Sequence, residues 1–318
     1  MNSQRGAAVI MALFVVVLCT LVVGPLIWTL FATAKSISVS AARDQTQEVA
    51  LSGLDWARVI LREDARVSTF DALTEPWAVP LSESRLNEGL MRRGESASNL
   101  QDRDTSITGR IEDAQGRFNL RNLGEDSLQL QEWTAAFNRL CTLLGVAQSD
   151  VETIQTVLGS MFTKNTESGL LNEPGVIQPI VPKIPVEVPA QQWAEFRGQY
   201  NLSDEAWQQL APYVVILPKP TLVNVNTASA EVVYASIEGL SFADAQGIVS
   251  YRERVAYKEL SDLRAAVNVN TEQNNALIDV TSQYFLVEGR AQVQEAIVKT
   301  SALLQRKDLR VYVLWRHD

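Results

Sequence analysis

The chain has 318 residues and a formal net charge of −9, with 28 lysines and arginines against 37 aspartates and glutamates. This length suits one large or two modest domains. The acidic balance argues against sequence-independent binding of nucleic acid, because such binding depends on basic side chains that neutralise phosphates.

The chain begins with a long apolar stretch. An uncharged run extends from Ala7 to Ala34 and follows a short leader that ends in Arg5-Gly6. As a helix of about 28 residues it is roughly 42 Å long, which exceeds the ~30 Å hydrocarbon core of a bilayer. A cleaved secretory signal would end at Ala32-Thr33-Ala34, but a signal needs only about half this length. A plain transmembrane anchor fits the length well.

A third interpretation of the same stretch is a prepilin start. A short leader with a basic residue directly before Gly6 resembles the type IV prepilin signal, which a membrane peptidase cuts after the glycine. The cut would fall between Gly6 and Ala7, and the resemblance implies methylation of the new amine of Ala7. The residues of this stretch alone leave the plain anchor and the prepilin helix equally open.

One position departs from the usual prepilin pattern. Pilin-like proteins usually carry Glu at the fifth mature position, where this chain has Met11. A carboxylate inside the bilayer is costly unless it is paired, and in pilins its proposed partner is the amino terminus of the subunit ahead. Within that resemblance, Met11 implies a subunit with nothing ahead of it, at the fibre tip.

Few charges flank the apolar run. Arg5 and the amino terminus lie on one side, and Lys35 lies on the other. This gives a slight preference for a cytoplasmic N-terminus, and we expect one membrane pass with the rest of the chain outside the cytoplasm. Cys19 lies within the run and Cys141 in the body, so we expect no internal disulfide.

The helical pattern continues from Lys35 to Ala65. Apolar residues recur at helical spacing at Ala50, Leu54, Ala57 and Leu61, which predicts an amphipathic stripe. We expect one long helix, kinked at Gly24-Pro25, with its first half in lipid and its second half on a soluble domain. Residues expected to pack against partner helices are Met11, Val49, Gly53, Leu54, Trp56, Ala57 and Ile60.

The rest of the chain alternates between helices and strands. Turn residues and apolar spacing first predict mostly loop at Ser68–Gln101, a strand at Thr105–Arg110, a turn at Asp113–Gly116 and a strand at Arg117–Leu120. They then predict helices at Leu128–Leu144 and Asp150–Phe162 (capped by Ser149 or Asp150), a proline-rich loop at Thr163–Pro189, and short helices at Gln191–Tyr200 and Ser203–Leu210. The chain closes with a predicted meander of strands at Ser282–Arg290, Gln292–Leu304 and Leu309–Trp315. A helix is the alternative for Gln292–Leu304.

The stretch from Val223 to Val267 predicts two helices joined by a tight turn. A helix begins near Asn226, capped by Thr227 or Ser229, and a second spans Phe242–Arg254. The pattern resembles a helix-hairpin-helix, whose hairpin amides hold a DNA phosphate. The DNA-binding form usually has two glycines in the turn, whereas this chain has Gly239 and Ser241. Because the stretch is also net acidic, it favours a packing module over DNA binding.

The sequence has few residues in patterns typical of catalysis, so we expect that the chain is not an enzyme. The only histidine is His317, which argues against a catalytic triad, and Cys141 among apolar neighbours is typical of a core residue. Zinc spacings, a phosphate-binding loop and a dinucleotide fingerprint are absent from the sequence. The pairs Asp102/Asp104 and Glu112/Asp113 offer oxygen ligands for calcium, but a solvated loop or edge is the more common role of such pairs.

Five features, in the same order along the chain, resemble the large minor pseudopilins of type II secretion, the general secretion pathway protein K family. They are the prepilin-like start without Glu at the fifth mature place, Gly53–Ala57 followed by Asp64, Asp71–Ala78, Ile111–Leu120 followed by Asn122-Leu123, and Val223–Ala228. Gly116–Leu120 and Asn224–Ala228 are the most specific, and the resemblance covers most of the chain.

The resemblance implies an α+β fold: a transmembrane helix continues into a pseudopilin-like long helix on an antiparallel sheet, with a large inserted helical domain that contains a helix-hairpin-helix or SAM-like module. The implied parts are a leader (1–6), a transmembrane helix (7–34), the pseudopilin helix and early strands (35–123), the helical domain in two parts (124–220 and 221–280), and the last strands (281–318).

The resemblance also implies a role and partners. The role is a non-enzymatic subunit that caps and initiates the pseudopilus for protein export, at the bacterial inner membrane with its body in the periplasm. The implied partners are the minor pseudopilins I and J, prepilin peptidase and inner-membrane lipid, without nucleic acid. Some relatives bind calcium, but their acidic segment has no match at Leu158–Asn172, so no cofactor is carried over. The alternative is a membrane-anchored DNA-binding or DNA-uptake protein.

Overall fold

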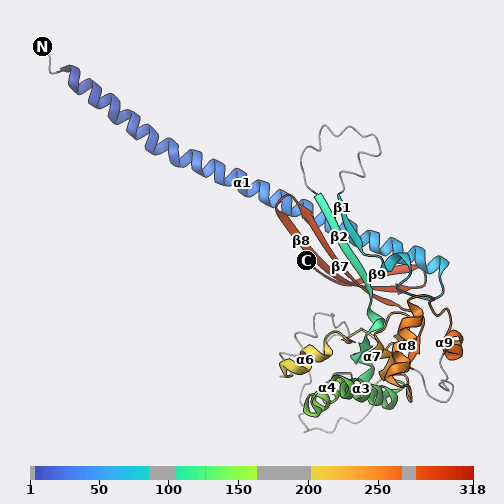
Figure 1. Ribbon diagram of the computed structural model, residues 1–318. Coiled ribbons are helices and arrows are strands. Elements are labelled where there is room, and N and C mark those ends of the chain that lie inside the picture. The colour runs from blue at the N-terminus through green and yellow to red at the C-terminus, as the bar shows by residue number, and fades with distance from the viewer. Residues whose placement is uncertain (1–3, 86–104, 126, 163–201, 267–276) are drawn as a thin grey trace, which may run out of the picture. The chain divides into compact units, whose positions relative to one another are not determined.

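The computed structural model describes residues 4–85, 105–125, 127–162, 202–266 and 277–318 (Figure 1). The chain divides into two compact units. The first comprises residues 1–52, 83–108 and 290–299, and the second comprises residues 53–82, 109–289 and 300–318. The predicted loop at Thr163–Pro189, the predicted helix at Gln191–Tyr200 and the pair Asp102/Asp104 lie outside the described residues.

Helix α1 extends from Gln4 to Val67 as one element, which confirms the predicted long helix. It continues through Pro25 without ending. Its apolar half has a window of mean hydropathy 2.9 that is 0% buried, so this helix is long and apolar enough to cross a membrane. In the first unit, Thr46 and Ala50 are the buried positions of α1, and Ala291 and Val293 are buried near the end of strand β7.

A five-stranded sheet forms the body, in the order β1-β2-β7-β8-β9. Its strands are β1 (Leu81–Arg85), β2 (Thr105–Asp113), β7 (Tyr284–Val293), β8 (Ala296–Lys307) and β9 (Arg310–His317). The predicted closing meander is confirmed, and the helix alternative for Gln292–Leu304 is wrong. The prediction that Ser68–Gln101 is mostly loop missed β1 and the 3-10 turn η1 (Pro76–Ala78), and residues 86–101 of this stretch lie outside the described part of the chain.

In the second unit, the C-terminal part of α1 packs on this sheet. Leu54, Ala57 and Leu61 are buried against a layer made of Trp77, Ile111, Phe285, Ala302, Leu304 and Val311. The rings of Trp77 and Phe285 meet edge to face at 5.3 Å. The amphipathic stripe of the sequence is therefore the face that α1 turns to its own sheet.

The remaining elements of the second unit are short. They are η3 (Ala114–Gly116), β3 (Phe118–Asn119), η4 (Leu120–Leu123), α3 (Leu130–Leu144), α4 (Gln148–Met161), α6 (Asp204–Leu210), β4 (Val214–Val215), β5 (Val223–Asn224), α7 (Ala230–Ser236), α8 (Phe242–Arg252), α9 (Leu260–Ala266) and β6 (Ile278–Asp279). Most of their buried apolar side chains share one core, in which Phe118 contacts Trp133 and Phe137. Ala114 and Val215 pack instead with Leu217, Tyr284 and Leu303.

Local predictions in this region were partly right. Ser229 caps α7 through a hydrogen bond to Val232 N–H, as one alternative predicted. Helix α4 has Ala147 at its N-cap without a side-chain cap, so the predicted caps Ser149 and Asp150 lie inside the helix. The predicted strand at Arg117–Leu120 is only the two-residue β3, which pairs in parallel with β4.

Candidate functional site: a buried polar junction

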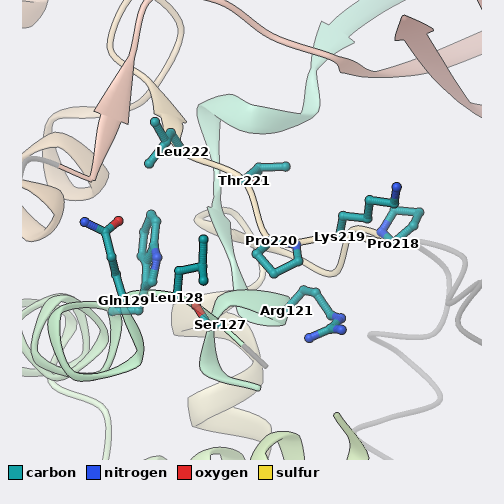
Figure 2. Close-up of a pocket in the computed structure, with 10 residues that line it drawn as sticks. Arg121, Ser127, Leu128, Gln129, Pro218, Lys219, Pro220, Thr221 and Leu222 are labelled. Carbon is teal, nitrogen blue, oxygen red and sulfur yellow. The ribbon is translucent and has the colours of Figure 1, made fainter. Parts of the chain in front are cut away.

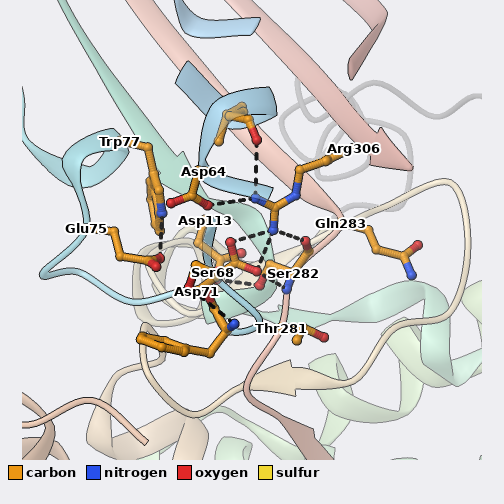
Figure 3. Close-up of polar contacts among 12 residues, drawn as sticks. Asp64, Ser68, Asp71, Glu75, Trp77, Asp113, Thr281, Ser282, Gln283 and Arg306 are labelled. Carbon is orange, nitrogen blue, oxygen red and sulfur yellow. Dashed lines mark hydrogen bonds and ion pairs between the residues drawn. The ribbon is translucent and has the colours of Figure 1, made fainter. Parts of the chain in front are cut away.

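Five polar residues from distant parts of the chain meet in the second unit, and we call this cluster the polar junction: Asp71, Asp113, Asn224, Ser282 and Arg306. Figure 3 shows Asp71, Asp113, Ser282 and Arg306 of this cluster. Asp71 follows α1, Asp113 ends β2, Asn224 ends β5, Ser282 precedes β7 and Arg306 lies near the end of β8. The junction therefore joins the five-stranded sheet to the segment that carries the short helices of the second unit.

Arg306 is the cation of the junction. Its Nη1 donates to Asp64 Oδ2 at 2.9 Å, and its Nη2 donates to the two carboxylate oxygens of Asp71 at 2.5 and 2.6 Å. Nη2 also donates to the carbonyl of Ser282 at 3.0 Å. The Arg306 side chain is only 10% exposed. A charge this buried is tolerated because its partners are charged and oriented toward it.

Asp113 is the acceptor that binds the other segments together. One of its carboxylate oxygens accepts from Ser282 Oγ at 2.6 Å, Thr227 Oγ1 at 2.6 Å and Asn224 Nδ2 at 2.8 Å. The other accepts from the backbone N–H of Gln115 at 2.8 Å. These donors come from β5, the turn after it and the segment before β7, so one carboxylate fixes three parts of the chain.

A second set of amides holds the strap formed by residues 217–222. Asn119 Nδ2 donates to the carbonyl of Lys219 at 2.8 Å, and Asn119 Oδ1 accepts from Leu217 N–H at 3.1 Å. Asn122 and Thr221 exchange two hydrogen bonds of 2.8 and 2.9 Å. Gly116 lies directly against Thr227. The two segments that carry the most specific family resemblance thus lie side by side.

Burial raises the pKa of the junction carboxyls. The pKa of Asp71 rises to about 7 because burial outweighs the stabilising contacts with Arg306 and Ser282 N–H. Burial is also the main cause that raises the pKa of Asp64 and of Asp113. The carboxyl groups of Asp64 and Asp71 share the guanidinium of Arg306, and the pKa of about 7 for Asp71 favours its protonation near neutral pH.

Oxygen atoms of Asp64, Asp71 and Glu75 lie within 4.8 Å of one another, close enough to hold a metal ion. Arg306 already pairs with Asp64 and Asp71, and Glu75 accepts from Ala72 N–H at 2.9 Å and from Trp77 Nε1 at 3.0 Å. We therefore interpret the cluster as structural. The calcium alternative for Glu112 and Asp113 is also disfavoured, because Glu112 pairs with Arg110 and Arg117 and Asp113 accepts four hydrogen bonds.

A pocket of about 570 Å³ lies between this strap and the start of α3 (Figure 2). Its walls include Leu128, Trp133 and Pro220, and Lys219 lies at its rim. Leu128 is 99% exposed. The pocket is mainly apolar and contains no arrangement of side chains typical of catalysis.

The sequence-predicted processing and packing residues all lie on α1. Gly6 and Ala7 fall in its first turns, and Met11 is 73% exposed. Trp56 is 42% exposed, while Val49, Gly53 and Ile60 are half-buried. Leu54 and Ala57 are buried in the chain's own core, so we withdraw these two from the predicted partner surface, because a partner helix cannot reach them.

The hairpin between α7 and α8 has the predicted tight turn, with Gly239 at φ +76. The Ser241 hydroxyl accepts from Asp244 N–H at 3.1 Å and donates to the Asp244 carboxylate at 2.6 Å. An acidic side chain therefore lies at the helix N-terminus where a DNA-binding hairpin holds phosphate. This disfavours the DNA-binding alternative, and the name helix-hairpin-helix or SAM-like module stays a prediction.

The two side chains considered for nucleophilic chemistry, Cys141 and His317, lie in different elements, α3 and β9. Cys141 is buried, and burial raises the pKa of its thiol to about 12, which confirms its predicted place in the core. His317 lies at the end of β9 with its ring 5.4 Å from that of Trp315.

A membrane-competent helix that continues onto an antiparallel sheet, with helices inserted between the strands, defines a pilin-like membrane-anchored subunit. Two family models, both described as type II secretion system (T2SS), protein K, match residues 116–219 and 223–281. The chain belongs to this family, as the sequence analysis predicted, and is a minor pseudopilin of type II secretion.

Individual relatives agree with this assignment. The type II secretion system protein K of Pseudomonas aeruginosa is 27% identical over 330 residues, covering 99% of this chain and 93% of the relative. That of Aeromonas hydrophila is 27% identical over 236 residues, covering 67% and 71%. The fold matches a chain in the crystal structure of the GspK-GspI-GspJ complex from enterotoxigenic Escherichia coli, with a TM-score of 0.61, 18% identity, and 86% and 95% coverage.

The sequence placed Asp71 and Asn224 only in family segments and considered Asp113 only as a turn residue and a possible calcium ligand, so it did not predict that these residues meet. Neither Ser282 nor Arg306 was predicted as a site residue. Arg306 carried a signal that was available. It follows the apolar residues Ala302, Leu303 and Leu304, two positions beyond the end of the predicted strand Gln292–Leu304. If the strand continues, Arg306 points to the same face as Ala302 and Leu304, because side chains alternate along a strand. A charged side chain on a buried face needs a buried partner of opposite sign.

Proposed function

We propose that this chain is the minor pseudopilin at the tip of the type II secretion pseudopilus, where it caps the fibre and initiates its assembly. The observation that carries this proposal is Met11 at the fifth position after Gly6, on a helix whose apolar half is exposed. A subunit that follows no other subunit has no amino terminus with which to pair a buried carboxylate, so it has no use for Glu there.

The bulk of the second unit supports the same role. The polar junction ties the helices of this unit to the end of β2 and the start of β7, so they are carried as part of the subunit body. A body of this size obstructs the addition of another subunit on the same side. The exposed apolar half of α1 holds the subunit in the inner membrane, with the N-terminus in the cytoplasm and the body in the periplasm.

The partners in this proposal are the minor pseudopilins I and J of the same system. A chain with this fold occurs in a GspK-GspI-GspJ complex, and the exposed or half-buried positions of α1, Met11, Val49, Gly53, Trp56 and Ile60, offer a helix surface for them. Prepilin peptidase removes residues 1–6 and methylates Ala7. The chain has no enzymatic activity of its own.

Two measurements test this function. The intact mass of the chain, from cells with and without prepilin peptidase, should correspond to methylated Ala7 as first residue only when the peptidase is present. The full chain should also copurify with I and J in detergent. A chain that keeps Met1 in both strains and binds neither partner contradicts the proposal. Salt-dependent affinity of the same preparation for duplex DNA would then support the DNA-binding alternative.

A further inference from the structure

The last strand leaves one edge of the sheet open. Strand β9 pairs only with β8 in the strand order, and its register places Val311 opposite Arg306, Tyr312 opposite Gln305 and Val313 opposite Leu304. In an antiparallel pair, opposed residues alternate between those that bond to each other and those whose backbone groups point away from each other. The phase of this alternation decides which groups of β9 face outward.

Two contacts fix that phase. The backbone N–H of Arg306 donates to the carbonyl of Gln283 at 2.7 Å, on the β7 side, so the backbone of Arg306 points away from β9. The carbonyl of Val311 accepts from Arg58 Nε at 3.2 Å, so it also points away from β8. Val313, two residues further along, has the same orientation. Its N–H and C=O therefore face the open edge, and neither has a partner within the described part of the chain.

The central residues of this edge are apolar, and two of their side chains are accessible. The run from Val311 to Trp315 contains neither charge nor proline, and Tyr312 and Val313 are 45% and 39% exposed. Sheet edges that stay in solvent are usually blocked by lysine, proline or inward-pointing charges. The centre of β9 has none of these, so its composition is typical of an edge that another strand covers.

We propose that β9 is a docking edge for one extended strand of a partner pseudopilin, with apolar side chains and a carboxylate near Arg310, which pairs its backbone with Val313. This inference rests on the proposed function and adds the surface that the partner uses. Main-chain hydrogen bonds supply affinity in such strand addition, and alternate side chains supply specificity. The incoming strand carries apolar side chains opposite Tyr312 and Val313.

Charge supports a partner strand rather than a second copy of this chain. Lys307 and Arg310 are exposed at one end of the hairpin, with Asp308 as the only acid between them, so a strand with a carboxylate at that end fits. An antiparallel pair of two β9 strands centred on Val313 would place Arg310 of each copy opposite Arg316 of the other. Like charges directly opposite each other destabilise such a pair.

Residue-resolved amide hydrogen exchange tests this inference on the full chain in detergent, alone and with I and J. We expect the exchange of Val313 N–H to slow at least about tenfold in the complex, while Tyr312 N–H, which already faces β8, changes little. If the complex forms and Val313 N–H exchanges as fast as before, the inference is overturned and the proposed function stands. If no complex forms, both fail. Protection of Val313 that grows with the concentration of the chain alone overturns the inference in favour of a second copy.

A pair of variants gives an independent readout. Val313→Lys places a charge on the open edge, and we expect it to weaken binding of I or J at least tenfold. Val313→Thr keeps a β-branched side chain and should bind within about threefold of wild type. Both variants should have the wild-type unfolding temperature within a few degrees, because this side chain is partly exposed. Equal binding by the two variants contradicts strand addition.

Discussion

Gly116 lies so close to Thr227 that a Cβ atom at position 116 would be 2.9 Å from Thr227 Oγ1 and 3.1 Å from the Thr227 carbonyl oxygen. Backbone of the η3 turn therefore meets backbone of the turn after β5 with no space for a side chain. This contact lies between the two segments that most specifically resemble the protein K family.

The first prediction concerns this contact. Gly116→Ala should lower the free energy of unfolding by about 1–3 kcal/mol, because the added methyl group forces the two turns apart. Gly247→Ala is the matched control, since a Cβ there meets nothing within 4 Å and Gly247 lies inside α8. The control should be neutral or stabilising. Denaturant unfolding of both variants measures the difference, and equal effects would contradict the close approach.

A second prediction concerns Arg306. Arg306→Ala leaves the carboxylates of Asp64 and Asp71 buried without their cation, which should cost about 3–5 kcal/mol. Arg306→Lys keeps the charge but loses the forked contacts, so it should restore only part of the stability. Arg110→Ala is the control, because the Arg110 side chain is 54% exposed in its pairs with Glu112 and Glu288, and it should cost at most about 1 kcal/mol. Thermal unfolding distinguishes these variants.

The third prediction concerns pH. Asp71, whose pKa is raised to about 7 by burial, is faced by Asp64 from α1, by Glu75, by Asp113 from β2 and by Arg306 from β8. The folded state holds this proton more tightly than the unfolded chain, whose aspartate pKa is about 3.9. This contribution to stability is complete below about pH 4 and is lost as pH rises through about 7.

The unfolding temperature should therefore rise as the pH falls from about 8 to about 6. The overall negative charge produces a similar trend in any variant, so the comparison is with Asp71→Asn, which removes the titrating group. The unfolding temperature of the Asp71→Asn variant should change less than that of the wild type over the same pH interval. Identical slopes for both proteins would mean that Asp71 titrates well below this range.

A fourth prediction concerns Met11. Met11→Glu should reduce the amount of subunit recovered with I and J, because an unpaired carboxylate in the bilayer costs several kcal/mol. Met11→Leu keeps the position apolar and should behave as wild type. Immunoblots of membrane fractions and the yield of secreted protein measure the effect. Wild-type secretion with Met11→Glu would remove the main support for a tip position.

Periodicity and turn residues predicted α1, α3 and the β7–β8–β9 meander because each is long enough for its pattern to stand out. Strand β1 was missed, since the proline at position 80 and the polar residues of Leu81–Arg85 are typical of a loop. Leu54 and Ala57 were assigned to a partner surface because a helical stripe does not reveal whether it packs on its own chain or on another.

The polar junction was beyond prediction from one sequence for a different reason. Its members come from five separate segments, and only the fold brings Asp113 and Arg306 toward Ser282. Asparagine and serine in short turns usually satisfy local backbone groups, so nothing about Asn224 or Ser282 alone indicated a distant acceptor. The family segments located the right regions without indicating that they meet.

The most direct test of the proposed tip position is a measurement of where this subunit lies in isolated pseudopili and how many copies each fibre contains. A single labelled cysteine in the periplasmic body, in a strain that overproduces the major pseudopilin, reports both quantities by single-molecule imaging. A tip subunit predicts one label per fibre, always at the same end, and far fewer fibres when the subunit is absent. Labels distributed along the fibre, or unchanged fibre numbers without the subunit, would contradict the account.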